Sequence, residues 1–400
     1  MRAPRLLTAG LLLALVYGPT AALADTAAPS IDPTAPTPTT PYAGGPPEGR
    51  SADGSVVGGD ELAGRSLVLP ADAPPLPTGL TARGWLLADL DSGDVLAARD
   101  PHGRYYPAST LKTLTLLALY DELDPSAVVT ATFEDASVEG TRVGLVEGGK
   151  YPVPLLFQAL MMASGNDAAS ALARAAGGVD VALELMNAAA SQIQAYDTLA
   201  GTPSGLDVAG QSSSPYDLAL IMRRLIDDPE LLAVLQTPTA MMPAVPPRYP
   251  AYQIQNQNPM FATFSGTLAG KNGFTDAARY TFVAAAERNG RRLVVSMMQG
   301  EQAPTRMTDQ VGTLLDWGFA LPAGSGTVGR LVDPRPPGVP PPTSAPTTAD
   351  PQPPPRTSVA ARADDTAGTP SAGVQTLLVV GGAMASAALL MLGLRGRRRH

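Results

Sequence analysis

Short apolar runs bounded by turn residues lie near both ends of the region 81–322. In the first pair of runs, Asp91-Ser92-Gly93-Asp94 separates the two apolar segments, and in the second pair Asn289-Gly290 does so. Both are turn sequences, so each pair predicts a β-hairpin. The strands expected from this pattern are 85–90, 95–98, 280–287 and 293–298.

Between the two hairpins, apolar residues recur at the spacing of a helix. Strands at both ends with helices between them predict a sheet, formed by the first and last segments, around a helical lobe. The paired methionines 161/162, 241/242 and 297/298 are expected to fill the core. The helices expected from the spacing are 114–123, 155–163, 167–176, 179–193, 216–226 and 307–317.

The segments outside this region have a different composition. Arg2 and Arg5 precede an apolar run and a small-residue cleavage site, so residues 1–24 are expected to be a secretory signal peptide. Residues 25–80 are rich in Pro, Thr, Ala and Gly and are expected to be disordered, and residues 323–373 form a Pro-rich linker. The folded domain is therefore expected over 81–322, about 240 residues, which is large for one compact unit but normal for a domain with two lobes.

A second apolar run predicts a membrane anchor near the C-terminus. Residues 374–394 carry no charge, and a helix of this length spans a bilayer. Four arginines follow within the basic tail 395–400, and the positive-inside rule keeps that tail in the cytoplasm. The sequence therefore predicts a single-pass cell-membrane protein whose folded domain is extracellular.

Composition excludes several kinds of chemistry. The chain has no cysteine and only two histidines, His102 and the final residue His400. A cysteine nucleophile and a thiolate metal site are impossible, and a Ser-His-Asp triad or a histidine-rich zinc site is disfavoured, although counting alone does not dismiss His102. The net charge of -8 offers no basic surface, so we expect no nucleic-acid partner. A serine hydrolase of this composition needs a different base, and lysine is the natural candidate.

Lysine is rare in this chain, and its positions are therefore informative. Only three lysines occur, against 25 arginines, so arginine supplies the generic positive charge. An ammonium group loses its proton when burial depresses its pKa, whereas a guanidinium stays charged. Two of the lysines, Lys112 and Lys271, lie in short motifs that also occur in serine hydrolases.

Three short motifs place serines and lysines in a fixed order. Ser109-Thr110-Leu111-Lys112 begins a predicted helix, so Lys112 lies one turn along from Ser109 on the same face. Ser164-Gly165-Asn166 follows 55 residues after Ser109, at a junction between two predicted helices. Lys271-Asn272-Gly273 lies 107 residues further on, on a strand before the last hairpin. Each motif alone also fits a chance match or a plain turn; their common order and spacing carry the signal.

This order and spacing resemble those of the penicillin-recognising serine hydrolases. Further segments are similar to the D-alanyl-D-alanine carboxypeptidase family of low-molecular-mass penicillin-binding proteins, over about residues 83–320. The resemblance implies a β-lactamase/DD-peptidase-like α/β (α+β) fold, that is, an antiparallel sheet with flanking helices and a helical lobe. It also implies that 81–322 is the catalytic domain and that this domain faces the cell wall. The matching segments are 107–112, 163–169, 202–207, 273–278 and 314–319.

The resemblance also implies a role for each motif residue. Ser109 attacks the carbonyl between the two terminal D-alanines of a peptidoglycan stem peptide, and neutral Lys112 takes its proton. Ser164 and Asn166 relay that proton to the departing D-alanine and hold the substrate. The backbone N–H groups of Ser109 and Phe274 form the oxyanion hole. No metal or cofactor is implied, and β-lactams are expected as inhibitors. The implied substrate-binding residues are Lys271, Asn272, Gly273, Phe274, Thr275 and Arg306.

Two positions depart from the family pattern, and three alternatives stay open. Asn272 stands where threonine is usual, and Arg279 stands where a small residue is expected.

An endopeptidase that cuts D-alanyl cross-links uses the same residues. A class A β-lactamase needs a deacylating glutamate, and the nearest candidate, Glu184, reads as helix surface. A wall-binding homologue that is inactive or insensitive to penicillin would keep the fold, and Asn272 is its only support.

Overall fold

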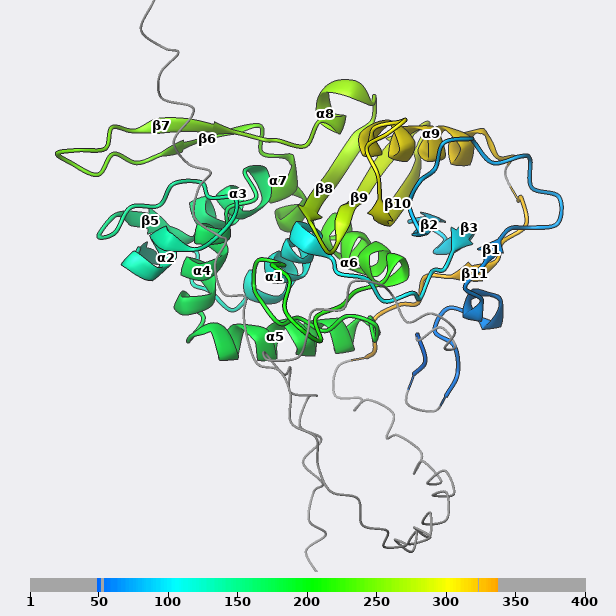
Figure 1. The fold of residues 1–400 in the computed structure, drawn as a ribbon, viewed down its shortest axis with the longest axis horizontal. Helices are drawn as coiled ribbons and strands as arrows, with labels where there is room; N and C mark the ends of the chain where they lie inside the picture. Colours follow the sequence, from blue (N-terminus) through cyan, green and yellow to red (C-terminus); the bar gives the residue numbers. More distant parts are fainter. Residues whose placement is uncertain (1–48, 52–53, 323, 337–400) are drawn as a thin grey trace, which may run out of the picture. The chain divides into compact units, whose positions relative to one another are not determined.

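The computed structural model describes residues 49–51, 54–322 and 324–336 of the chain (Figure 1). The predicted signal peptide, 1–24, and the predicted anchor, 374–394, lie outside these residues. Within the described part, no helix is both long enough and apolar enough to span a bilayer.

An antiparallel sheet forms the centre of the domain (Figure 1). Its strands follow the order β1-β3-β2-β10-β9-β8, and β11 also pairs with β3. The first hairpin therefore lies beside the last one, β2 against β10, as the sequence predicts. The strands are β1 (Leu67–Val68), β2 (Gly84–Asp89), β3 (Asp94–Arg99), β8 (Thr267–Thr275), β9 (Arg279–Arg288), β10 (Arg291–Gly300) and β11 (Gly329–Arg330).

The turn between β9 and β10 shows why this hairpin forms where it does. Asn289 and Gly290 both have positive φ, 55° and 78°. A two-residue type I′ turn requires positive φ at both central positions, and Asn-Gly tolerates it best. The local sequence thus sets the register of the two long central strands.

Helices cover both faces of the sheet (Figure 1). On one face, α9 (Met307–Ala320) packs on β9 and β10 through an apolar core that includes Leu314 and Val295. On the other, α6 (Pro215–Asp227) packs on β2, β9 and β10 and joins the sheet to the helical lobe. The lobe contains α1 (Lys112–Leu119), α2 (Phe133–Ser137), α3 (Val153–Met162), α4 (Asn166–Ala175), α5 (Val179–Gln192) and α7 (Pro229–Gln236).

The sequence pattern locates the long helices but misses several short elements. α1, α3, α4, α5, α6 and α9 confirm the predicted helices to within a few residues. Two small two-stranded sheets and some short helices were not predicted, because none of their elements is long enough to show a hydrophobic period. The missed elements are α2, α7, α8 (Met260–Thr263), β4 (Val128–Thr130), β5 (Lys150–Pro152), β6 (Thr239–Met242) and β7 (Tyr252–Gln255).

The two flanks of the folded region differ from the expectation. Residues 54–80, expected to be disordered, include the 3₁₀ helix η1 (Asp60–Ala63) and β1, and Leu62 is fully buried. On the other flank, the backbone N–H of Arg330 in β11 donates to the carbonyl of Gly58 at 2.8 Å. Composition misses both segments because a few apolar residues, among them Leu62 and Leu331, and backbone hydrogen bonds to distant parts of the chain order them.

Candidate active site

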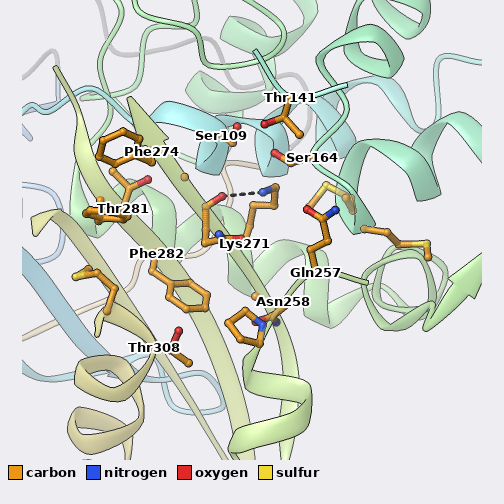
Figure 2. Close-up of a pocket in the computed structure, with 18 of the residues that line it drawn as sticks. Ser109, Thr141, Ser164, Gln257, Asn258, Lys271, Phe274, Thr281, Phe282 and Thr308 are labelled. Carbon is orange, nitrogen blue, oxygen red and sulfur yellow. Dashed lines mark hydrogen bonds between the residues drawn. The ribbon is translucent and has the colours of Figure 1, made fainter. Parts of the chain in front are cut away.

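A cavity of about 290 Å³ lies between the edge of the sheet and the helical lobe (Figure 2). Its walls include the 3₁₀ helix directly before α1, the junction of α3 and α4, β8 and the start of α9. The structure brings all three sequence motifs to this cavity. The motif residues that line it are Ser109, Ser164, Lys271, Asn272 and Gly273.

Ser109 and Lys112 occupy consecutive turns of one helical segment. Ser109 lies in the 3₁₀ helix η2 (Ala108–Leu111), and Lys112 begins α1 directly after it. Lys112 Nζ and Ser109 Oγ form a hydrogen bond of 3.0 Å. The spacing of three residues therefore delivers the contact that the sequence predicts.

The surroundings of the Lys112 amine fit its neutral form. Nζ donates to Asn166 Oδ1 and to the carbonyl oxygen of Ser204, both at 2.7 Å. A neutral amine has two N–H groups and one lone pair. These two acceptors use both N–H groups, so the lone pair is left to face the Ser109 hydroxyl. In this state Lys112 is able to accept the proton of Ser109.

Electrostatics favour the same protonation state. The Lys112 side chain is fully buried. Burial lowers the pKa of Lys112 well below its ordinary value, and the positive charge of Lys271 lowers it further, while the negative charge of Asp167 acts in the opposite direction. Burial disfavours the charged form of an amine because the interior solvates it poorly.

Lys271 approaches the cavity from the strand side. It lies in β8 with only 3% of its surface exposed, and its Nζ donates to the carbonyl of Asn272 at 2.7 Å (Figure 2). Burial lowers the pKa of Lys271 to about 7. A bound anion would stabilise the protonated form, so the charge of this lysine is coupled to whatever occupies the cavity.

β8 presents an open edge beside Ser109. It ends the strand order of the main sheet, so in the described part of the chain no further strand pairs with its outer edge. A Cβ added at Gly273 would lie 2.6 Å from the backbone nitrogen of Ser109, so glycine lets the strand approach the serine this closely. An extended peptide binds to such an edge through backbone hydrogen bonds.

The lobe side of the cavity is held by the junction of α3 and α4. Ser164 lies there with a positive φ of 56° and faces the cavity (Figure 2). Asn166, two residues on, begins α4, and its backbone N–H donates to the carbonyl of Thr141 at 2.8 Å. Its side-chain Nδ2 donates to the carbonyl of Glu139 at 2.7 Å. The other end of the amide, Oδ1, is thereby turned toward Lys112.

Comparison with known proteins identifies the protein family of this chain. Residues 71–302 match the family model of the D-alanyl-D-alanine carboxypeptidases, peptidase family S11. The chain belongs to this family. Both the resemblance inferred from the motifs and the predicted fold class are thereby confirmed.

Individual relatives agree with the family model. Over 259 residues, the chain is 44% identical to D-alanyl-D-alanine carboxypeptidase DacB2 of Mycobacterium tuberculosis. The matched region makes up 64% of this chain and 87% of that protein. It is 31% identical over 258 residues to DacD of Escherichia coli, covering 61% and 64% of the two chains. A crystal structure of a D-alanyl-D-alanine carboxypeptidase from M. tuberculosis superposes with a TM-score of 0.63 at 42% identity, over 66% of this chain and 99% of that one.

Membership of the family establishes the general activity. The chain is a serine-type D-alanyl-D-alanine carboxypeptidase of the penicillin-binding group, which acts on peptidoglycan and binds β-lactams.

Two of the predicted substrate-binding residues lie beside the cavity rather than in its wall. Thr275 Oγ1 donates to Asp207 Oδ1 at 2.9 Å, so Thr275 joins the end of β8 to the segment 202–207. Arg306 is exposed at the N-cap of α9, directly before the cavity-lining residues Met307 and Thr308. Among the described residues that form the wall, neither Thr275 nor Arg306 is present.

The two departures from the family pattern lie on the strand side of the cavity. Asn272 is exposed and lines the wall. Arg279 forms a two-pronged ion pair with Glu301, in which Nε and one terminal nitrogen each donate to a carboxylate oxygen at 2.8 Å. Its guanidinium also lies 5.6 Å from the centre of the Phe274 ring. Arg279 therefore has its charge paired and stabilises the ring at the cavity mouth.

The residues that the rival interpretations need lie elsewhere. His102 is fully buried outside the cavity wall, where Nδ1 is 2.8 Å from Asp197 Oδ2 and Nε2 is 3.0 Å from the carbonyl of Val57. Glu184 lies on the exposed face of α5 and is not among the described residues of the wall. A histidine base and a deacylating glutamate of the class A β-lactamase kind thus find no support at this site.

Several contributors to the site escaped the sequence analysis. The carbonyl groups of Ser204 and Glu139 fix Lys112 and Asn166, but a backbone carbonyl leaves no side-chain signature. The one available signal was Gly205, in the family-like segment 202–207. Its φ is 84°, and a Cβ there would lie 1.9 Å from the carbonyl oxygen of Ala108, so this glycine permits the close approach that brings Ser204 to Lys112.

Proposed function

We propose that Ser109 is the nucleophile, and Lys112 the general base, of a carboxypeptidase that removes the terminal D-alanine from peptidoglycan stem peptides. The observation that carries this proposal is the set of partners around Lys112 Nζ. Nζ lies 2.7 Å from two fixed acceptors, Asn166 Oδ1 and the Ser204 carbonyl, and 3.0 Å from Ser109 Oγ. In the neutral amine the two acceptors take both N–H groups, which leaves the lone pair for the Ser109 hydroxyl.

The reaction begins with proton transfer from Ser109 Oγ to Lys112 Nζ as Oγ bonds to the substrate's carbonyl carbon. The resulting oxyanion accepts hydrogen bonds from the backbone N–H groups of Ser109 and Phe274. The bond between the carbonyl carbon and the D-alanine nitrogen then breaks, and that nitrogen takes the proton through Ser164. Asn166 holds Lys112 and the substrate throughout. Water hydrolyses the acyl-enzyme in the second half-reaction, which releases the shortened peptide and restores Ser109.

The strand side of the cavity recognises the substrate. The stem peptide binds along the open edge of β8, which Gly273 allows to lie close to Ser109. Its terminal carboxylate interacts with protonated Lys271 and with the amide of Asn272, which donates a hydrogen bond as the usual threonine hydroxyl would. Arg306 adds positive charge from the start of α9, and Thr275 supports the strand through Asp207.

The chain is proposed to act at the outer face of the cell membrane. A leader at 1–24 exports it, and the uncharged run 374–394 anchors it, followed by the basic tail 395–400. The Pro-rich stretch 323–373 then separates the enzyme from the bilayer as a semi-rigid spacer.

The test is D-alanine release from a synthetic pentapeptide by the full-length chain. Ser109→Ala is expected to release none, whereas the control Ser137→Ala, at an exposed serine of α2, is expected to match the wild type. Cleavage of a D-alanyl cross-linked dimer is measured in parallel. An enzyme that cuts the dimer and leaves the pentapeptide intact is an endopeptidase, and that result would reject the proposed substrate.

A further inference from the structure

Asp167 is a buried carboxylate next to the active site that the proposed mechanism does not use. It lies in the first turn of α4, directly after Asn166, and its side chain is fully buried. Its two oxygens accept hydrogen bonds from the backbone N–H groups of Val143, Gly144 and Leu145, at 2.9, 2.7 and 2.9 Å. Consecutive N–H groups converging on one anion form a compact binding concavity, here filled by the protein's own carboxylate.

The segment held in this way is the loop 139–146. It lies within residues 138–149, which form neither helix nor strand, so regular backbone pairing does not fix its position. Tyr252 Oη on β7 also contacts the loop, at 2.7 Å from the carbonyl of Val143 and 3.3 Å from that of Gly144. Val143 and Leu145 are buried in the apolar core, and the Val146 N–H donates to Tyr151 Oη at 3.0 Å. Among the side chains that bond to this loop, the carboxylate of Asp167 makes the most hydrogen bonds, three.

The same loop determines how the Asn166 amide is turned. Its carbonyl at Glu139 accepts from Asn166 Nδ2 at 2.7 Å, and its carbonyl at Thr141 accepts from the Asn166 backbone N–H at 2.8 Å. A reversed amide would place its oxygen against the Glu139 carbonyl and its NH₂ group against the Lys112 amine, losing both hydrogen bonds. The loop therefore keeps Asn166 Oδ1 directed at Lys112.

We propose that Asp167 is a positioning residue for the reaction. Its carboxylate holds the loop 139–146 in the arrangement that turns Asn166 Oδ1 toward Lys112 and so aims the Lys112 lone pair at Ser109. This inference rests on the proposed roles of Ser109 and Lys112.

Asp167 also acts on Lys112 through its charge. Two charged groups influence the pKa of Lys112: Lys271 on β8 lowers it, and Asp167 on α4 raises it. Removing the negative charge therefore lowers the pKa of Lys112 further, and the neutral amine persists to a lower pH. This effect gives the positioning role a signature that lost stability alone does not produce.

The decisive variant is Asp167→Asn, which keeps the shape but removes the charge and replaces an acceptor by a donor. We expect kcat for D-alanine release to fall roughly 10- to 100-fold, because the base is misaligned, with KM within about threefold of the wild type. The acid limb of kcat/KM against pH is expected to shift to lower pH.

The matched control is Asp135→Asn. Asp135 is also almost fully buried in the lobe and holds a backbone N–H, at Thr132, together with Ser170 and Arg174, away from Lys112. We expect it to lower the Tm without moving the acid limb. The proposal is overturned if Asp167→Asn behaves like this control. Its acid limb would then lie at the same pH as in the wild type, and its loss of kcat would be no larger than that of Asp135→Asn.

A second variant covers the case in which Asp167→Asn does not fold. Gly140 is exposed on the loop, and a Cβ there would lie 2.8 Å from Asn166 Nδ2. Gly140→Ala is expected to reduce kcat at least about tenfold, since it disturbs the contact between the loop and Asn166. Unchanged kcat in Gly140→Ala would overturn the proposal.

Acylation by benzylpenicillin, followed by intact mass, separates this inference from the proposed function. A wild type that is acylated but releases no D-alanine counts against the proposed substrate. In that case the acylation rates of Asp167→Asn and Asp135→Asn, measured across pH, decide the role of Asp167 by the same criteria.

Discussion

The two sides of the active site are built differently. On the lobe side, Lys112 and Asn166 are 0% and 5% exposed, and every polar atom of their side chains has a fixed partner. On the strand side, Asn272 is exposed, Phe274 is 45% exposed, and the edge of β8 has no neighbouring strand in the described part of the chain. The proposed reacting groups are thus held by the protein itself, whereas the proposed recognition surface keeps open positions that a bound peptide would complete.

This difference predicts how each side responds to substitution. A buried, fully bonded group has no room to adjust, so its replacement removes chemistry outright. An exposed group on an open edge adjusts or is replaced by water, so its substitution changes binding by smaller amounts. Substitutions of buried groups on the lobe side should therefore act mainly on kcat, and those of exposed groups on the strand side, such as Asn272, mainly on KM.

The largest effect is expected from Lys112→Arg. A guanidinium stays protonated and has no lone pair for the Ser109 proton, so acylation should slow by about 10³-fold or more. Lys150→Arg is the matched control, because Lys150 is exposed on β5, and it should leave the rate unchanged. Substantial acylation by Lys112→Arg, measured with a pentapeptide or with benzylpenicillin, would remove Lys112 from the role of base.

The next largest effect is expected from Gly273→Ala, because the added methyl group fills the narrow space between β8 and Ser109. The added methyl would lie 2.6 Å from the Ser109 nitrogen, and β8 must move away from the proposed oxyanion hole. Loss of one such donor reduces kcat by about 10²- to 10³-fold. The control is Gly64→Ala, where φ is negative and the nearest neighbour is 3.7 Å away. Equal kinetics in the two variants would contradict this placement of β8.

The charge of Lys271 should make kcat/KM and kcat depend differently on pH. Burial lowers the pKa of Lys271 to about 7, so the free enzyme loses this positive charge as the pH rises above that value. We expect kcat/KM to fall by up to about tenfold per pH unit above 8, while kcat persists because the bound carboxylate keeps Lys271 protonated. In Lys271→Arg the charge no longer titrates, so this alkaline limb should disappear. An alkaline limb that survives in Lys271→Arg belongs to another group.

The smallest effect is expected from Asn272→Thr, the reversion to the usual family residue. Both side chains donate a hydrogen bond to a carboxylate, so kcat/KM should stay within about threefold of the wild type or rise. The measurement is D-alanine release from a pentapeptide under matched conditions. A collapse of activity would mean that this enzyme binds its substrate in a geometry that requires the longer amide.

The sequence predicted which side chains gather at the candidate site better than it predicted the groups that support them. Ser109, Lys112, Asn166 and Lys271 were found from motif spacing, because a helix turn and the family order fix their relation. The loop 139–146 was missed, since its function depends on backbone carbonyl groups that no side chain marks. Long-range hydrogen bonds of this kind are set by the tertiary fold alone.

The same limit applied to the fold. Long helices and the Asn289-Gly290 hairpin have local signals, and both were predicted. The methionine pair at 241/242 was expected to fill the core, but the two side chains lie on β6, where neighbours point to opposite faces: Met242 is fully buried and Met241 is 59% exposed. A strand of four residues is too short to show that alternation in sequence.

The most direct test of the account is an intact-mass time course of the full-length chain with benzylpenicillin, beside Ser109→Ala. The account predicts a persistent penicilloyl adduct on the wild type, located at Ser109 by peptide mapping, and none on the variant. A wild type that forms no adduct, or a Ser109→Ala variant that forms the same one, would contradict the assignment of Ser109 as the nucleophile activated by Lys112.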